Sequence, residues 1–298
     1  MNQELNGRIF REKGIRLIIK REDLVYPEIQ GNKWRKLKYN LAFAQEKGYV
    51  QILSFGGAYS NHIAAVAAAG KKFGLKTVGI IRGDQPEKFN PTLQRALQNG
   101  MTLRFVSRPE YKSYTQQGQT DDLQKQYPFA YFIPEGGTNG LAIKGCAEIL
   151  TEEDKAEFDI FACPVGTAGT ITGIISSLKG QKKVLAFPAL KGSFLKNDMK
   201  TLSKEHGSGY TNYDLIDKYH FGGYAKHNPE LLDFINRFYD DYQIPLDPIY
   251  TGKMMYGLFD MVEQDLFEED TSILAIHTGG LQGIAGFNDR FGTELKVN

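Results

Sequence analysis

The fold is decided by residues 158–178, FDIFACPVGTAGTITGIISSL, where a strongly apolar run leads through a glycine-rich turn into a second apolar run. The first run, Phe158–Pro164, is typical of a strand that is buried on both faces. The turn, Val165–Thr170, combines glycines with hydroxyl side chains. The run from Thr170 to Leu178 fits a helix that starts at this turn. The unit therefore predicts a parallel strand followed by a covering helix.

The same alternation of strand and helix patterns continues along most of the chain. It indicates an α/β fold with mainly parallel sheets that are covered by helices on both faces. The polar stretch Lys191–Tyr213 has no clear pattern, and we expect it to be mobile or to cover a pocket. Further strands are predicted at Ile15–Lys20, Val50–Phe55, Thr77–Ile81, Thr102–Val106, Tyr131–Ile133, Val184–Phe187 and Ile273–His277. Further helices are predicted at Asn61–Phe73, Asn90–Asn99, Leu141–Leu150, Pro229–Asp241 and Lys253–Gln264.

Composition excludes several classes of protein. The chain has 298 residues, of which 41% are hydrophobic and 24% charged, and its formal net charge is +1. Such a balance provides no overall field for nucleic acid or for an anionic membrane. Apolar stretches such as Ile63–Gly70 are too short to span a bilayer, and the first residues lack the pattern of a signal peptide. Cys146 and Cys163 have no metal-ligand spacing, so we expect a cytoplasmic protein without a metal site.

Residues 31–36, GNKWRK, place three basic side chains behind a glycine at a predicted helix start. A basic helix start is suited to binding an anion. One of its lysines could neutralise a phosphate, and another could act as a covalent amine. On its own, a solvated basic helix start is the commoner interpretation of such a cluster.

Two glycine-rich turns lead from predicted strands into helices. In residues 54–62, SFGGAYSNH, the glycines allow close backbone approach, and Ser60, Asn61 and His62 present polar side chains at the helix start. Simple capping of the helix is the alternative. In Val165–Thr170, free N–H groups and hydroxyls suit a phosphate. That turn has neither the Walker A nor the GxGxxG pattern, and its alternative is an ordinary tight turn.

Three weaker motifs occur in similar positions. They are residues 134–139, PEGGTN, residues 277–280, HTGG, and residues 247–253, DPIYTGK, the last taken together with GGY at 222–224. Capping, a core histidine and packed tyrosines would explain them separately. Pyridoxal phosphate chemistry would require them all. It needs a Schiff-base lysine, a phosphate cup, polar partners for the ring, and donors for a substrate carboxylate.

In this order, the motifs resemble those of the pyridoxal-phosphate enzymes with the tryptophan synthase β-subunit-like fold. They are most similar to the branch that contains 1-aminocyclopropane-1-carboxylate deaminase and D-cysteine desulfhydrase. The resemblance extends from Lys20–Asp23 to Thr278–Gly280. It implies two doubly wound domains, a large cofactor-binding domain of residues 1–40 and 144–298 and a small domain of residues 41–143. It also implies a homodimer that binds a small amino acid.

The resemblance assigns roles to individual residues. It implies that Lys33 is the Schiff-base lysine, that Lys36 contacts the phosphate, and that Asn61 faces the ring hydroxyl. Ser60 and His62 would lie on the substrate side. The active-site tyrosine pair would be Tyr224 and Tyr250, and the phosphate cup would consist of Val165, Gly166, Thr167, Ala168, Gly169 and Thr170.

Two threonines distinguish the candidate activities. In the deaminase group, the residue after the second tyrosine is a glutamate that pairs with the pyridine nitrogen, and the residue before the last Gly-Gly is typically not threonine. Here these positions are Thr251 and Thr278, which the resemblance places at the cofactor. A neutral hydroxyl makes the ring a weaker electron sink, which suffices for β-elimination but less readily opens a cyclopropane.

The sequence therefore favours β-elimination from D-cysteine to pyruvate, ammonia and hydrogen sulfide. Freed Lys33 or a relay of Tyr250 and Ser60 would remove the α-proton. A 1-aminocyclopropane-1-carboxylate deaminase, or a related pyridoxal-phosphate deaminase of small amino acids, is the first alternative. A protein that binds a ligand with the same fold but has lost turnover is the second.

Overall fold

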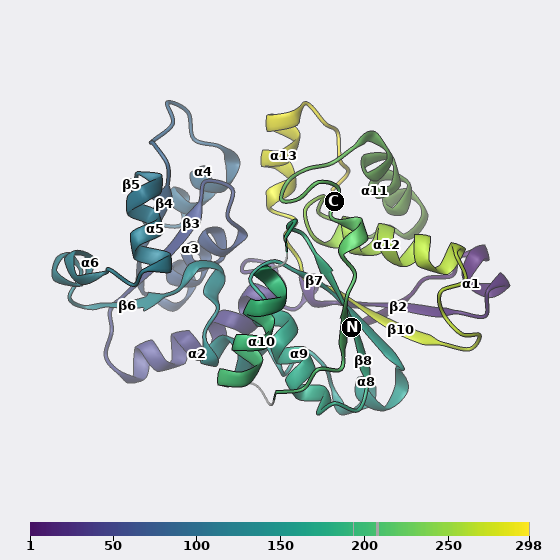
Figure 1. Ribbon diagram of the computed structural model, residues 1–298. Helices are drawn as coiled ribbons and strands as arrows, with labels where there is room; N and C mark the ends of the chain where they lie inside the picture. The colour runs from purple at the N-terminus through teal and green to yellow at the C-terminus, as the bar shows by residue number, and fades with distance from the viewer. Residues whose placement is uncertain (193, 207–208, 298) are drawn as a thin grey trace.

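A computed structural model describes residues 1–192, 194–206 and 209–297 and divides its strands between two sheets (Figure 1). Within these residues the larger sheet has the order β1-β2-β10-β7-β8-β9, and the smaller sheet has the order β5-β4-β3-β6. The larger sheet consists of β1 (Asn2–Glu4), β2 (Arg16–Arg21), β7 (Ile160–Val165), β8 (Lys183–Pro188), β9 (Tyr213–Leu215) and β10 (Ser272–His277). The smaller sheet consists of β3 (Gln51–Gly57), β4 (Lys76–Arg82), β5 (Met101–Val106) and β6 (Ala130–Ile133).

Nearly all strand pairs are parallel, which confirms the predicted fold class. The three strand pairs of the smaller sheet are parallel, and in the larger sheet only β1 runs antiparallel to its described neighbour, with Asn2 opposite Lys20. β1 and β9 were not predicted, because each has three residues and lacks a continuous apolar run. Every other described strand lies at a predicted position, within a residue or two at each end.

Helices cover both sheets, and several of them start at capping side chains. Ser60 accepts a hydrogen bond from the Ile63 N–H at the start of α3, and Asn228 accepts one from the Leu231 N–H at the start of α11. The helices are α1 (Arg8–Glu12), α2 (Asn32–Glu46), α3 (Asn61–Phe73), α4 (Pro91–Gln98), α5 (Arg108–Gln116), α6 (Asp121–Gln126), α7 (Gly140–Cys146), α8 (Glu152–Glu157), α9 (Gly169–Leu178), α10 (Phe194–His206), α11 (Pro229–Tyr242), α12 (Thr251–Glu263) and α13 (Gly283–Phe291).

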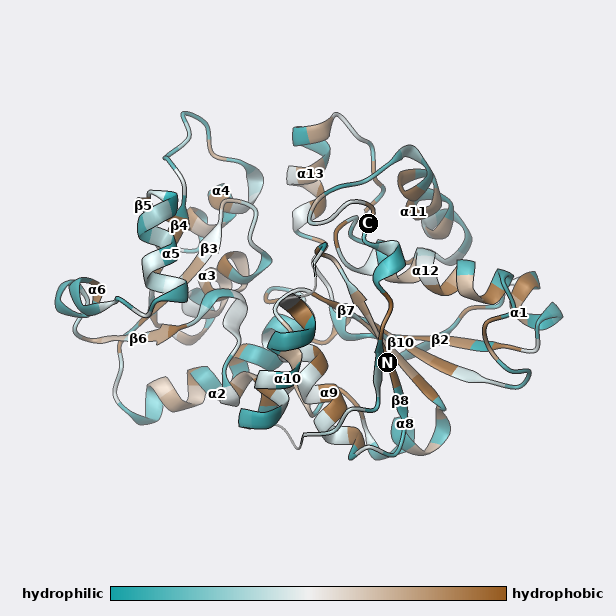
Figure 2. Cartoon of the chain, viewed as in Figure 1, coloured by the Kyte–Doolittle hydropathy of each residue, from teal (hydrophilic) through white to brown (hydrophobic). Residues whose placement is uncertain are grey.

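Alternate residues of the central strands belong to different cores, as expected of a sheet covered on both faces. Leu17 and Ile19 of β2 pack in the cluster that contains α11 and α12. Ile18, between them, packs in the cluster that contains α9. Figure 2 shows hydrophobic residues concentrated along these central strands. Continuous apolar strands therefore fold as parallel strands between two helical layers. No described helix is both long enough and apolar enough to cross a bilayer.

The unpatterned stretch Lys191–Tyr213 contains a helix, α10, and residues 193 and 207–208 within it lie outside the described residues. Leu195 and Met199 are buried in the same core cluster as α9. Two apolar anchors among many polar residues give a weak helical signal, which explains why the sequence did not predict this helix.

Helix α2 packs against α7, which in turn packs against α9. The approach of α2 and α7 is close, because a Cβ on Gly145 would lie 2.0 Å from the Arg35 carbonyl oxygen. The first turn of α2 is thereby held beside the turn that precedes α9. The predicted domain boundaries, 40/41 and 143/144, fall within α2 and α7, and the division into domains stays a prediction.

Candidate active site

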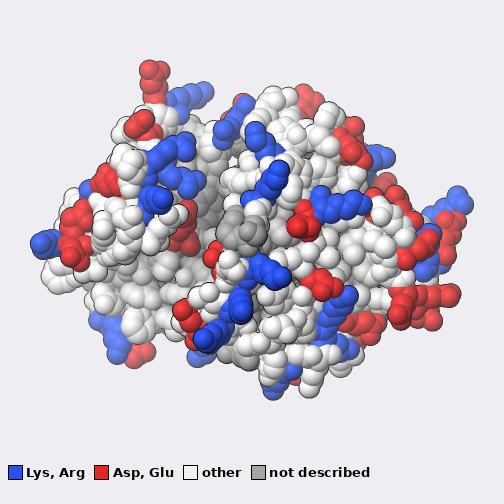
Figure 3. Space-filling view, in the orientation of Figure 1, with Lys and Arg blue, Asp and Glu red and all other residues white. Residues whose placement is uncertain are grey.

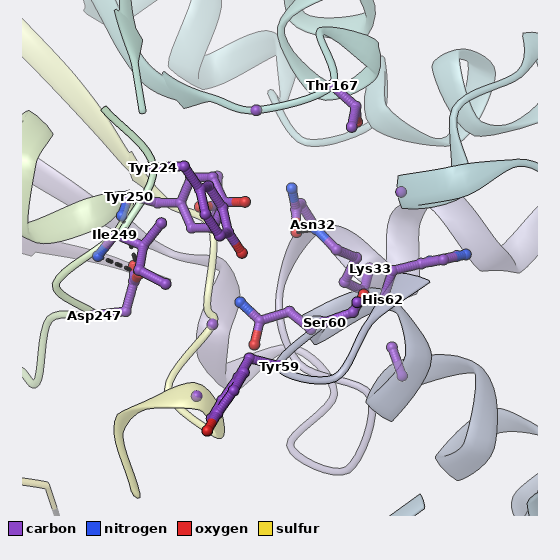
Figure 4. Close-up of a pocket in the computed structure, with 18 of the residues that line it drawn as sticks. Asn32, Lys33, Tyr59, Ser60, His62, Thr167, Tyr224, Asp247, Ile249 and Tyr250 are labelled. Carbon is purple, nitrogen blue, oxygen red and sulfur yellow. Dashed lines mark hydrogen bonds between the residues drawn. The ribbon is translucent and has the colours of Figure 1, made fainter. Parts of the chain in front are cut away.

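A cavity of about 1060 Å³ lies between the two sheets and collects most of the predicted site residues. Figure 3 shows a hollow between the two lobes, and Figure 4 shows the side chains that converge within it. Predicted residues on the cavity wall are Lys33, Lys36, Ser60, Asn61, His62, Val165, Gly166, Thr167, Ala168, Thr170, Tyr224, Tyr250 and Thr278. Gly169 and Thr251 are not among the lining residues.

Lys33 occupies the first turn of α2, directly after a glycine that allows close chain approach. Gly31 has a φ of +59°, and a Cβ there would lie 2.2 Å from the Thr278 carbonyl oxygen, so only glycine fits. The Lys33 Nζ donates to Asn32 Oδ1 at 3.0 Å. Burial, and secondarily the neighbouring Lys36 charge, lower the pKa of Lys33 to about 7. The amine is therefore available as a nucleophile or base near neutral pH.

Lys36 is a buried cation surrounded by neutral oxygen atoms. Its Nζ donates to the Gly136 carbonyl at 2.8 Å and to the hydroxyls of Thr138 and Thr167 at 3.1 Å each. Its exposed fraction is 2%, and burial lowers its pKa. No carboxylate pairs with it among the described residues. Since a buried charge without a counter-charge is costly, this arrangement favours an anion beside Lys36.

The turn from β7 into α9 brings a helix N-terminus to the same place. Ala168 has a φ of +56°, and this left-handed residue directs the chain into the first turn of α9. A Cβ on Gly169 would lie 2.9 Å from Thr138 Oγ1 and 3.3 Å from Lys36 Nζ. Gly169 thus approaches the Lys36 ammonium closely, although it does not line the open cavity. A helix N-terminus beside an unpaired ammonium is suited to a phosphate.

His62 presents a hydrogen-bond acceptor without a donor. The Ser54 hydroxyl donates to the Ile133 carbonyl at 2.8 Å, so it must accept from His62 Nε2–H, also at 2.8 Å. His62 Nδ1 then carries a lone pair, and it has no hydrogen-bond partner within the described part of the chain. Burial lowers the pKa of His62 well below its usual value, which keeps the ring neutral.

Asn61 is held by a residue that approaches from the larger lobe. Its Oδ1 accepts a hydrogen bond from the side-chain amide of Gln282. The Gln282 Oε1 accepts another from the Thr92 hydroxyl at 3.2 Å in α4. Gln282 therefore connects the segment before α13 to two helices of the smaller lobe. Ser60, next to Asn61, caps α3 and faces the cavity.

The two predicted tyrosines meet at the cavity wall. The rings of Tyr224 and Tyr250 lie 6.2 Å apart at an angle of 70° (Figure 4). Lys253 fixes the Tyr224 loop, because its Nζ donates to the carbonyls of His220 at 2.9 Å and Gly223 at 2.8 Å. Burial raises the pKa of both tyrosine hydroxyls. Both tyrosines therefore keep their protons at neutral pH.

Thr251 lies behind Asp247 rather than at the cavity. Its hydroxyl donates to Asp247 Oδ1 at 2.8 Å and accepts from the Asp247 N–H at 2.9 Å. The Asp247 carboxylate also accepts from the N–H groups of Ile249, Tyr250 and Thr251 and so caps α12 (Figure 4). Asp247 lines the cavity and Thr251 does not. Capping of α12 turns the Thr251 hydroxyl toward Asp247, and the contact of Thr251 with the cofactor stays a prediction.

Comparison with known proteins agrees with this geometry. Residues 6–279 match the family of pyridoxal-phosphate dependent enzymes. The chain belongs to this family.

Relatives in this pyridoxal-phosphate family cover nearly the whole chain. A bifunctional D-cysteine desulfhydrase/1-aminocyclopropane-1-carboxylate deaminase of Arabidopsis thaliana, described as mitochondrial, is 30% identical over 91% of this chain and 74% of its own length. A D-cysteine desulfhydrase of Serratia proteamaculans is 29% identical over 92% of this chain and 89% of its own. The crystal structure of an ACC deaminase homologue has 30% identity and a TM-score of 0.83, covering 97% of this chain and 92% of that one.

The site has the features that the cofactor of this family needs. Lys36 and the start of α9 would hold the phosphate, since they offer an uncompensated ammonium together with free N–H groups. Lys33 would carry the cofactor, and Asn61 and Thr278 lie on the same cavity wall. The unpaired buried Nδ1 of His62 is a further polar atom that awaits a donor. We conclude that the residues present fit pyridoxal phosphate.

The sequence did not predict a role in the site for four residues that organise it. Asn32 supports Lys33, and its Nδ2 donates to Thr170 Oγ1 at 2.9 Å. Its position next to Lys33, within residues 31–36, was the sequence feature that could have indicated this role. Asp247 precedes a proline at the start of its motif, which is a common capping arrangement. Gln282 and Lys253 act through long-range contacts that no local pattern reveals.

Proposed function

We propose that this pyridoxal-phosphate enzyme catalyses β-elimination from a small amino acid, with D-cysteine as the favoured substrate and pyruvate, ammonia and hydrogen sulfide as products. The observation that carries the proposal is the position of Lys33. Its amine, with a pKa of about 7, lines the same cavity as the turn before α9, the Ser60 turn and the tyrosine pair.

The proton chemistry follows from the pKa values of these groups. When bound, pyridoxal phosphate supplies an electron sink for the substrate α-carbon. Lys33 would act as the base that removes the α-proton, because its pKa is close to neutral pH. Burial raises the pKa of Tyr250 well above its usual value, so this hydroxyl is a poor base. Tyr250 and Tyr224 would instead donate protons to the departing group.

Substrate orientation would depend on the start of α3. Ser60 faces the cavity at the N-terminus of this helix, where the first N–H groups have no partner within the helix. A substrate carboxylate bound there would lie on the side of the cavity opposite to the phosphate turn. Asn61, fixed by Gln282, would separate the two sites by contacting the cofactor ring.

Thr251 supports the desulfhydrase activity over the deaminase. It places a hydroxyl where the deaminase group has a glutamate, and that hydroxyl is already bonded to Asp247. A specific observation favours the second candidate, 1-aminocyclopropane-1-carboxylate deaminase. Among the described residues that line the cavity, Asp247 is the one buried carboxylate, and a carboxylate near the ring would strengthen the electron sink.

A substrate panel tests this proposal. Pyruvate release is measured from D-cysteine, L-cysteine, D-serine and 1-aminocyclopropane-1-carboxylate with the purified holoenzyme, and Lys33→Ala serves as the inactive control. We expect the highest kcat/KM with D-cysteine. Faster turnover of the cyclopropane acid would establish the second candidate. A protein with the cofactor absorbance but no pyruvate from any substrate would be a ligand-binding protein, and the proposal would be wrong.

The proposal also includes a cytoplasmic homodimer. Both cysteines are free and buried, which supports a reducing compartment. Light scattering of the holoenzyme at several concentrations tests the dimer, and a mass equal to one chain at all concentrations would refute it.

A further inference from the structure

The mouth of the cavity carries four arginines that the proposed reaction leaves without a role. Arg82, Arg95, Arg108 and Arg290 all line the cavity and are exposed. Figure 3 shows basic side chains on both sides of the hollow between the lobes. Among the described residues, Arg95, Arg108 and Arg290 have no ion pair, and Arg82 has a long one with Glu135 at 3.9 Å. These guanidinium groups are therefore available to bind an anion.

Acidic residues do not cancel this charge. Glu28, Glu135, Asp198 and Asp247 also line the cavity. Glu28 is paired with Lys72 at 3.5 Å, and the Asp247 carboxylate is used by the cap of α12. This leaves Glu135 and Asp198 to balance the positive charge of the four arginines. The mouth thus has an excess of positive charge, which would attract an anionic substituent more strongly than a neutral one.

Two of the arginines lie on either side of the turn that carries Ser60. Arg82 is the last residue of β4 and stands opposite Gly57 in the parallel register. A Cβ on Gly57 would lie 3.5 Å from the Arg82 Nη2, so the guanidinium lies over this turn. The Arg290 guanidinium lies 5.3 Å from the centre of the Tyr59 ring. Both groups therefore lie beside the proposed carboxylate site.

The Arg82 side chain is held in this position from behind. Its guanidinium carbon lies 5.4 Å from the centre of the Tyr111 ring, a cation–π distance. Its charge also acts on Tyr224, where it lowers the pKa of the hydroxyl against the dominant effect of burial. Arg82 and the tyrosine that would protonate the leaving group therefore face the same space.

We propose that, among amino acids with an extended β-substituent, the enzyme prefers those whose substituent ends in an oxyanion over their neutral isosteres, and that Arg82 and Arg290 bind this second anion. The inference rests on the proposed function and extends it to the substrate class. The shared chemistry is a terminal carboxylate or phosphate on the side chain, separate from the α-carboxylate. A cavity of about 1060 Å³ is at the upper end of the ~300–1,000 Å³ usual for small-molecule sites, and it has room for such a substituent.

An isosteric pair of substrates isolates the charge. S-Carboxymethylcysteine and S-carbamoylmethylcysteine differ in a terminal carboxylate against a neutral amide of the same shape. The D and L forms of each are compared, and O-phosphoserine is added to distinguish phosphate from carboxylate. The readout is the ratio of kcat/KM for the charged and neutral members, which is independent of a general loss of activity. We expect the carboxylate to be preferred by at least about fivefold at low salt, and by less as salt increases.

Variants identify the residues responsible. Arg82→Gln and Arg290→Gln should each reduce the ratio, and the double variant should bring it close to one. Arg8→Gln, which removes an arginine in α1 that pairs with Glu12, should leave the ratio unchanged. A ratio near one in the wild type would refute the inference. So would arginine variants that weaken uptake of pyridoxal phosphate while the ratio persists, because the arginines would then serve the cofactor.

The inference and the proposed function can fail separately. Turnover of D-cysteine with no preference for the charged member would contradict the inference alone. If no amino acid is turned over, calorimetric binding of the charged and neutral members to the holoprotein replaces kcat/KM. Tighter binding of the charged member, lost in the double arginine variant, would then support the anion site without the lyase activity. Equal binding would refute it.

Discussion

The two sides of the cavity are built differently. On the side proposed to hold the phosphate, formed by Lys36 and the turn before α9, Lys36 is 2% exposed and makes three hydrogen bonds to neutral oxygens. On the substrate side, Arg82 has a side chain that is 47% exposed and an ion pair of 3.9 Å. Buried and bonded groups favour one ligand geometry, whereas exposed arginines can adapt to several. We therefore expect the proposed cofactor site to be rigid and the choice of substrate to depend on exposed side chains.

The largest effect is expected from Lys33→Ala. Loss of the amine should reduce kcat by at least about a thousandfold, because it removes the proposed base and the attachment of the cofactor. Borohydride should no longer fix the cofactor to the chain, and the yellow absorbance should change. Lys47→Ala, at the exposed end of the same helix, is the matched control. Full activity in Lys33→Ala would refute the assignment of Lys33 as the base and as the attachment point of the cofactor.

A second test concerns the buried charge of Lys36. Lys36→Met should weaken the binding of pyridoxal phosphate about a hundredfold, since a charge-assisted contact is lost. The same change should leave the apoprotein at least as stable, because it removes a buried cation without a counter-charge. Fluorescence titration and thermal unfolding measure the two effects. A marked loss of apoprotein stability would show that the surrounding groups already compensate the Lys36 charge without a bound anion.

Lys253→Met, which affects the loop that carries Tyr224, should reduce activity less than the two changes above. Loss of the hydrogen bonds to the carbonyls of His220 and Gly223 should loosen the loop that carries Tyr224. We expect kcat/KM for D-cysteine to fall about tenfold while the affinity for pyridoxal phosphate is retained. Lys218→Met, which removes an exposed ion pair with Asp260, is the control. Equal losses in both variants would deny Lys253 a specific role in positioning Tyr224.

A fourth effect, measured on stability rather than on catalysis, is a dependence of the apoprotein's free energy of unfolding on pH. The pKa of Lys33 is lowered from 10.5 to about 7 in the folded chain. Between these values the unfolded chain binds more protons, so the free energy of unfolding should rise with pH across this window. The contribution is absent below pH 7 and complete above 10.5. Denaturant unfolding of the wild-type and Lys33→Met apoproteins measures the difference, and an equal pH dependence in both would contradict the lowered pKa.

The sequence identified Lys33, Lys36 and the turn before α9, which the structure brings together at one cavity, while their contact with a phosphate stays a prediction. The helix start with Lys33 and Lys36, and the turn before α9, are local patterns of residue type and spacing. The orientation of Thr251 could not be predicted, because it depends on the capping of α12 by Asp247, a choice among several hydrogen bonds that spacing does not reveal. Helix α10 was missed because few of its described side chains are apolar and reach the core: Leu195 and Met199 are buried there, and Leu202 packs against them partly buried.

Gln282 has a consequence for movement between the lobes. Its single amide bonds both to Asn61 at the start of α3 and to Thr92 in α4. If the smaller lobe swings toward the larger one when an amino acid enters, both helices must move around this one side chain. Gln282 would then serve as a pivot, and closure would change the orientation of the Asn61 side chain within the cavity.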